Sequence, residues 1–103
     1  MIDRVDLLIE ILLDKTARED ERHEAAMDIG KYDDDRALAG LLKTASNPNE
    51  DTIILDACGE SIGQIVVKRR NEFRKEDIEK LAPLARDIAE EYIYGHRPEW
   101  KPT

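Results

Sequence analysis

The chain has 103 residues and a formal net charge of -8; 41% of its residues are hydrophobic and 39% are charged. This length fits one domain with one continuous core. The longest apolar stretches, at 7–9 and 11–13, fall far short of the roughly 20 residues of a membrane-spanning helix. The acidic balance disfavours binding to nucleic acid phosphates and favours a basic partner.

The first residues do not resemble a secretory signal peptide, because the acidic Asp3 and Asp6 occupy the region where such a signal carries basic residues. A single cysteine, Cys58, cannot form an internal disulfide. We therefore expect a cytoplasmic protein with no membrane contact. Negative charge is concentrated in residues 1–67, which hold 16 acidic and 7 basic residues.

The first helix is predicted over residues 3–14. A wide apolar arc that begins at Ile2 covers most of its circumference, and the remaining strip is acidic, with Glu10 and Asp14 following Asp3 and Asp6. The arc either packs against the next two helices or forms a dimer or partner contact. The chain is accordingly expected to be a monomer or a weak homodimer.

Four further helices are predicted, over 19–31, 36–45, from 51 to about 67, and 76–94. An aspartate turn at 33–35, a loop at 47–50 and a basic link at 68–75 connect them. The expected inward residues of the second and fourth helices are Arg22, Ala25, Ala26, Ile29, Ile54, Leu55, Cys58, Ile62, Ile65 and Val66. Residues 1–94 form the single domain in this prediction, and 95–103, with two prolines, form an extended tail.

One short pattern occurs twice, first over 24–30 and again over 57–63. Ala26, Ile29 and Gly30 in the first copy correspond to Gly59, Ile62 and Gly63 in the second. A small residue three positions before an Ile-Gly pair shares a helix face with the isoleucine, and the glycine is expected to end or loosen the helix. A repeat of this size is typical of stacked helix pairs, which usually serve as binding surfaces.

The stretch Ala26-Met-Asp-Ile-Gly30, followed by Asp35-Arg-Ala-Leu-Ala-Gly-Leu-Leu42, resembles the HEAT-like repeat of the phycobilisome-lyase type. Pro83 in Leu81-Ala-Pro-Leu-Ala85 is similar to the proline of that repeat's second helix. The resemblance covers residues 20–66 well and residues 1–19 and 76–94 loosely. It implies an all-α fold, a short right-handed α-solenoid of about five antiparallel helices, and leaves function open because these repeats serve chaperones, adaptors and lyase subunits.

In such stacks the second helix of each pair usually lines the concave surface. Aligning the two copies predicts an acidic groove that binds a basic protein, with the alternative that these side chains form a solvated polar face. Its residues are Glu24, Asp28, Asp56 and Glu60, with Asp33 and Asp34 at the turn; Glu10 and Asp14 form a second candidate surface. Trp100, near Arg97, Tyr92, Tyr94 and Phe73, is either a partner anchor or a lid folded back on the last helix.

Other sites are disfavoured by their sequence context. Three aspartates at 33–35 fit helix capping better than a metal site, and His23 and His96 lack ligands at zinc spacing. Cys58 is expected to be a buried core thiol. No phosphate loop, nucleophile elbow or metalloprotease motif is present. The prediction is therefore no enzyme, no metal and no cofactor.

The function expected from the sequence is binding of another protein. Its most specific form is an acidic immunity protein that occludes a basic bacterial toxin, such as a nuclease. The alternative is a HEAT-type chaperone, adaptor or lyase-associated subunit that binds a client segment or a chromophore.

Overall fold

A computed structural model describes residues 3–69 and 75–102, and this part of the chain is helical without any strand. It contains six α-helices and one turn of 3-10 helix. Their bounds are α1 (Arg4–Leu13), α2 (Glu19–Ile29), α3 (Asp35–Ala45), α4 (Thr52–Lys68), α5 (Lys75–Glu79), α6 (Pro83–His96) and η1 (Pro98–Trp100). The all-α prediction is confirmed. Ile2, Phe73 and most of the basic link at 68–75 lie outside the described residues.

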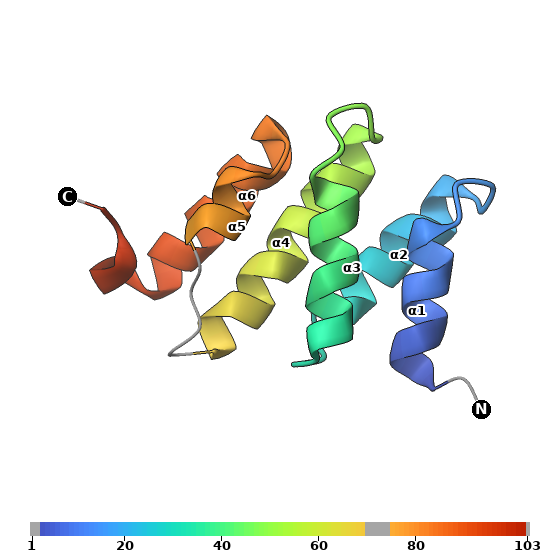
Figure 1. Cartoon of the computed structure of the whole chain (residues 1–103), viewed down its shortest axis with the longest axis horizontal. Helices are drawn as coiled ribbons and strands as arrows, with labels where there is room; N and C mark the ends of the chain where they lie inside the picture. The colour runs from blue at the N-terminus through green and yellow to red at the C-terminus, as the bar shows by residue number, and fades with distance from the viewer. Residues whose placement is uncertain (1–2, 70–74, 103) are drawn as a thin grey trace.

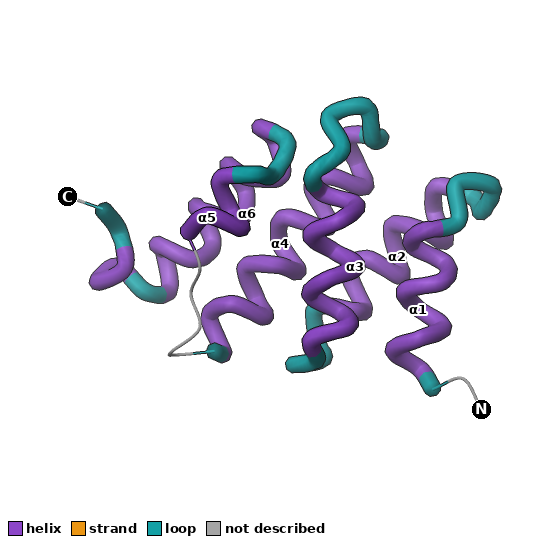
Figure 2. Tube along the Cα trace, viewed as in Figure 1, coloured by secondary structure: helices purple, strands orange, loops and turns teal. Residues whose placement is uncertain are grey.

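The helices form two layers in a flat molecule with extents of 42 × 30 × 18 Å. In Figure 1, α1, α3 and α5 lie nearer the viewer, and α2, α4 and α6 lie behind them. The helix α4 packs against α2, α3 and α6, while α1 packs against α2 and α3. The two termini lie at opposite ends of the long axis, and the helical layers follow chain order between them (Figure 2).

Each long helix turns an apolar face to a shared core. All the residues expected to face inward on the second and fourth helices are buried. Ile29 and Ile62, the equivalent isoleucines of the two pattern copies, are both 0% exposed. Full burial of such a side chain contributes on the order of 1.5–3 kcal/mol. The inward faces predicted for the second and fourth helices are therefore confirmed.

The glycines of the repeated pattern allow neighbouring helices to approach closely. A Cβ atom on Gly30 would lie 2.6 Å from Ser61 Oγ on α4, and one on Gly63 would lie 2.8 Å from Tyr92 Cβ on α6. Gly30 caps the end of α2, but Gly63 lies well inside α4. The expectation that the second glycine ends or loosens its helix was therefore wrong, because close packing against α6 is what this position requires.

The predicted helix over 76–94 is interrupted before Pro83. Ala82 has φ -56° and ψ 147°, an extended conformation that a following proline favours. Proline has no backbone N–H, so Pro83 suits the first turn of a new helix. Two helices, α5 and α6, result. The backbone N–H of Ala82 donates to Ala45 O at 2.9 Å, which fastens this break to the end of α3.

The end of the chain differs from the predicted extended tail. Helix α6 continues to His96, and Pro98–Trp100 form a 3-10 turn closed by Trp100 N–H donating to Arg97 O at 2.9 Å. The Arg97 guanidinium lies 5.8 Å from the centre of the Trp100 ring and donates to Val67 O at 3.2 Å. These contacts fold the tail against the end of α4.

Candidate protein-binding surface

The aspartates at 33–35 are engaged within the molecule. Asp34 caps α3 by accepting from Arg36 N at 2.8 Å, and the Arg36 side chain and backbone lower the pKa of Asp34 to about 2. Arg69 pairs with Asp33 and, at 2.8 Å, with Asp35. The capping role expected of this turn is therefore observed, and Asp34 is the capping residue.

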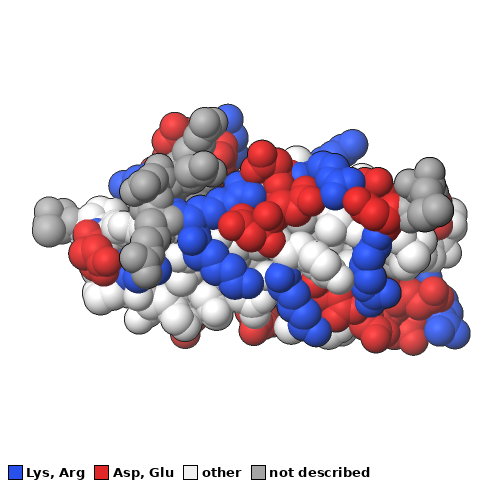
Figure 3. All heavy atoms as spheres, turned by 90° about the horizontal axis from the view of Figure 1, so that it is seen from below, with Lys and Arg blue, Asp and Glu red and all other residues white. Residues whose placement is uncertain are grey.

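Arg36 also draws in two acidic side chains of the first helix. Its guanidinium lies 3.0 Å from Asp3 Oδ2 and 2.8 Å from Asp6 Oδ1. Figure 3 views the edge that carries the starts of α1 and α3 and the end of α4, and basic and acidic groups alternate along it. Because opposite charges are interleaved there, this edge presents little net charge to a partner.

The two candidates at the solvent side of α1 differ in their contacts. Asp14 follows the helix and accepts from Thr16 Oγ1 at 2.6 Å and Thr16 N at 2.9 Å. These hydrogen bonds lower the pKa of Asp14, the hydroxyl having the larger effect. Glu10 is exposed and forms no ion pair with any described residue. Asp14 thus orders the α1–α2 turn, whereas Glu10 points freely to solvent.

Glu24 and Asp28 face α1 instead of α4. They line a shallow hollow of about 200 Å³ together with apolar residues of α1, among them Leu7 and Leu8. Asp28 lies 3.7 Å from Arg4 Nη2 and 3.4 Å from Lys31 Nζ. This surface is the outer edge of the stack on the N-terminal side.

The repeat explains why these two carboxylates are separated from those of α4. In the alignment that places Ile29 on Ile62, Glu24 corresponds to Ala57 and Asp28 to Ser61, both of which are buried. Ser61 Oγ donates to Ala26 O at 2.6 Å, so this position faces the preceding helix of its layer. Glu24 and Asp28 therefore lie on a different surface from Asp56 and Glu60.

The strongest candidate surface is formed by α4 and α6, and we call it the α4–α6 acidic face. Glu60 and Glu91 line a hollow of about 370 Å³ with Ile88, Tyr92, Gly95 and His96. Asp56 lies one turn before Glu60 on α4 and is exposed. Among the described residues, Asp56, Glu60 and Glu91 have no ion-pair partner, and neither Lys nor Arg lines the hollow.

Two stacked aromatic side chains line one side of this hollow. The rings of Tyr92 and His96 stack with centroids 4.2 Å apart and an angle of 18° between their planes. His96 Nδ1 lies 2.8 Å from Tyr92 O, so this nitrogen carries the proton that the carbonyl accepts. Apolar area beside unpaired carboxylates suits the stem and head of a partner's Lys or Arg side chain.

Sequence reasoning missed Asp87 and Glu91, although a signal for them exists. Asp56 and Glu60 recur on α6 as Asp87 and Glu91. The same alignment of α4 with α6 places Ile62 on Ile93, and both are 0% exposed. These α6 residues form a third copy of the pattern. It was not recognised because it follows the second copy at a slightly shorter distance along the chain than the second follows the first.

The remaining candidates are structural in their placement. Trp100 is half-buried and packs against the core. Of the two arrangements predicted for it, a partner anchor or a side chain folded back on the molecule, this corresponds to the second. Cys58 is fully buried, and burial raises the pKa of its thiol to about 12. The described residues include no cluster of three or more His, Cys, Asp or Glu side chains suited to a metal ion.

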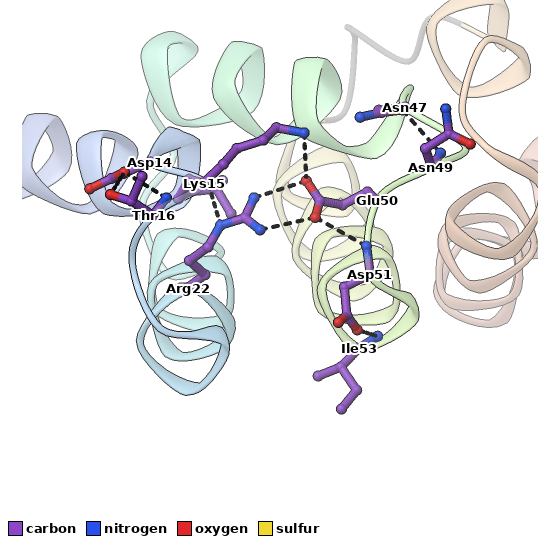
Figure 4. Close-up of polar contacts among 10 residues, drawn as sticks. Asp14, Lys15, Thr16, Arg22, Asn47, Asn49, Glu50, Asp51 and Ile53 are labelled. Carbon is purple, nitrogen blue, oxygen red and sulfur yellow. Dashed lines mark hydrogen bonds and ion pairs between the residues drawn. The ribbon is translucent and has the colours of Figure 1, made fainter.

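A buried ion pair ties the other end of the helices together (Figure 4). Arg22 of α2 donates through Nη1 and Nη2 to the two carboxylate oxygens of Glu50, each at 2.9 Å, and through Nε to Leu12 O at 3.0 Å. The guanidinium lowers the pKa of Glu50 to about 2. The pair joins the end of α1, the start of α2 and the α3–α4 loop.

No family model, curated protein or solved structure matches this chain. In the part of the chain that the structure describes, no helix combines the length and apolar character needed to cross a bilayer.

Proposed function

We propose that this protein is a non-catalytic protein-binding module, and most specifically an acidic immunity protein that binds and occludes a basic bacterial toxin. The observation that carries the proposal is the α4–α6 acidic face. Glu60 and Glu91 line a hollow that no described Lys or Arg lines, and Asp56 lies one turn before Glu60 on α4. None of these three carboxylates has an ion-pair partner among the described residues. Elsewhere most aspartates are neutralised by arginines of the same chain.

The proposal includes the finer description of the fold as a short right-handed α-solenoid of HEAT-like repeats. Its support is the layered order of α2, α4 and α6, with a glycine at each close approach, Gly30 against α4 and Gly63 against α6. Parallel helices in one layer place equivalent side chains in rows. On α4 and α6, which lie side by side in this layer, the acidic side chains are therefore held in neighbouring positions by rigid helices.

The mechanism of inhibition is occlusion of a basic substrate-binding surface. Uncompensated carboxylates on a chain of net charge -8 raise the encounter rate with a positively charged partner. Once docked, carboxylates paired with Lys or Arg fix the orientation. The stem of the cation packs on Ile88 and Tyr92, which line the same hollow as Glu60.

The first experiment captures partners of the tagged protein from its native cells with washes at low and high salt. We expect one basic protein whose retention falls as salt rises, because surface charge attraction is screened. In the alternative, a HEAT-type chaperone, adaptor or lyase-associated subunit, the protein retains a client or a chromophore irrespective of salt. A salt-indifferent partner, or none, overturns the immunity proposal.

Variants then locate the surface. Asp56→Lys combined with Glu60→Lys should weaken binding of the captured protein at least tenfold, because the substitutions place like charges opposite the partner. Glu10→Lys combined with Glu24→Lys is the matched control, since both residues are exposed and lie on other surfaces. Circular dichroism verifies helicity. Equal losses in both variants contradict the assignment to the α4–α6 acidic face.

A further inference from the structure

A third hollow, of about 400 Å³, has the opposite charge to the rest of the molecule. It lies where α1 ends, α2 begins and α3 leads into α4. Its lining consists of Leu13, Lys15, Arg22, Lys43, Thr44, Asn47 and Glu50. Three cationic side chains and one carboxylate give it a positive balance within a chain of net charge -8. We call it the Lys15–Lys43 hollow.

The only carboxylate that lines this hollow, that of Glu50, is neutralised by Arg22. Glu50 is 6% exposed at its side chain, and both oxygens are occupied by Arg22. Its Oε1 also accepts from Asp51 N at 3.0 Å. Figure 4 shows the guanidinium facing this carboxylate, with Lys15 reaching toward it from the α1–α2 turn. Glu50 therefore repels an incoming anion far less than an isolated carboxylate does.

Hydrogen-bond donors remain in the hollow after this pair is formed. Lys43 has no ion pair with any described residue, and the only ion pair of Lys15 within the described part of the chain is a long one, 3.7 Å from Nζ to Glu50 Oε2. The Thr44 hydroxyl is buried, with the residue 5% exposed, and has no hydrogen-bond partner in the described structure. Asn47 Oδ1 accepts from Asn49 N at 3.0 Å, which leaves the Asn47 amide group as a donor.

A buried hydroxyl without a hydrogen-bond partner is destabilising, and most such groups in proteins have a partner. The Arg22–Glu50 pair accounts for the join between three chain segments. It does not account for two lysines, a hydroxyl and an amide gathered around one hollow. A ligand rich in acceptor oxygens and negative charge satisfies all of them.

We propose that the Lys15–Lys43 hollow binds a phosphate group. A phosphate carries about -1.5 to -2 charges at pH 7 and three strong acceptor oxygens, which matches two incompletely neutralised ammonium groups better than a single carboxylate does. Lysine ammonium groups are well suited to phosphate as point charges. The hollow exceeds the size of the bare ion, so it accepts either inorganic phosphate or a small phosphate monoester. This site shares no residue with the α4–α6 acidic face and does not depend on the proposed function.

The test is a titration of the isotope-labelled protein with inorganic phosphate, followed by amide NMR shifts at constant ionic strength maintained with chloride. Saturable shifts are expected in residues 13–22 and 43–50. Lys15→Gln combined with Lys43→Gln should weaken binding at least tenfold. Both lysines are exposed, so the variant is expected to fold. Amide shifts that are unchanged from the unsubstituted protein at positions away from residues 15 and 43 verify this.

Lys31→Gln is the matched control, because Lys31 is exposed and follows the opposite end of α2. It should leave phosphate affinity unchanged. The absence of saturable shifts, an equal loss in Lys31→Gln, or equal affinity for acetate overturns the proposal. Tighter binding of glycerol 3-phosphate than of inorganic phosphate identifies a monoester as the ligand, and weaker binding identifies the free ion.

Discussion

Three arginines each pair with acidic side chains from distant parts of the chain and so reduce the number of acidic groups that face solvent without a counter-charge. Arg36 holds Asp3, Asp6 and Asp34; Arg69 holds Asp33 and Asp35; Arg22 holds Glu50. Only the last of these pairs is buried at both side chains, at 8% and 6% exposure. Exposed pairs contribute little, about 0–1 kcal/mol, whereas loss of one partner of a buried pair is costly. At the residue scale, stability is therefore most sensitive to Arg22 and Glu50.

This pair predicts a specific dependence of stability on pH. Glu50 has a pKa of about 2 in the folded chain against an ordinary value of 4.5. A lowered folded-state pKa adds stability that is fully present above about pH 4.5 and is lost as pH falls toward 2. Glu50→Gln should lower the free energy of unfolding by about 3 kcal/mol at pH 7 and reduce its slope between pH 5 and 2.

Urea unfolding followed by circular dichroism at pH 7, 5 and 3 measures this effect. Glu10→Gln is the control, because Glu10 is exposed and forms no ion pair with the described residues. An unchanged slope in Glu50→Gln would mean that the pair does not hold the carboxylate ionised.

At the scale of elements, neighbouring helices of one layer touch through glycines. A Cβ on Gly59 would lie 2.7 Å from Ala85 O, a backbone atom that cannot move aside. A Cβ on Gly95 would meet no neighbouring heavy atom within 4 Å, because this position of α6 is exposed. Small residues are thus required where two helices of the layer meet and dispensable where a helix surface is open.

A pair of glycine substitutions tests this difference. Gly95→Ala should stabilise the protein by about 0.5–1 kcal/mol, the ordinary gain of alanine over glycine in a helix. Gly59→Ala should destabilise it by about 1–3 kcal/mol, because overpacking outweighs that gain. Thermal unfolding of the two variants measures both signs. A stabilising Gly59→Ala would show that α4 and α6 can separate at little cost.

The whole molecule depends on α4, the helix that packs against α2, α3 and α6. Helices at the two ends of the stack have fewer neighbours, and stability in stacked helical arrays is dominated by contacts between neighbours. The ends therefore expose surface that a partner can use, while α4 holds the layers together.

Native-state hydrogen exchange should reveal this gradient. We expect the slowest amides in the central turns of α4, around Cys58 and Ile62, which are 0% exposed. Amides of α5 and of the last turn of α6 should exchange fastest among the helices, since local opening there breaks few contacts. Uniform protection from α1 to α6 would indicate a single cooperative unit instead.

Local rules account for what could be predicted. Helical periodicity identified the buried faces of α2 and α4. The first and fourth helices were expected to begin near residues 3 and 51, and in the structure Asp3 and Asp51 cap them by accepting from Asp6 N and Ile53 N. The break before Pro83 was missed despite being a local signal, because Ile78 and Leu81 continue the apolar stripe across it. Similarly, the change in repeat spacing between the second and third copies hid Glu91.

The sequence by itself determined the first four helices, the inward faces of α2 and α4 and the first two copies of the repeat, because these depend on residues three or four positions apart and on a pattern that recurs along the chain. Only the tertiary structure decided which charges remain available. Arg36 reaches Asp3 and Arg69 reaches Asp33 across different helices, and Lys15 and Lys43 meet at one hollow from separate segments. Such pairings follow from how helices pack in space, and no periodicity along the chain encodes them.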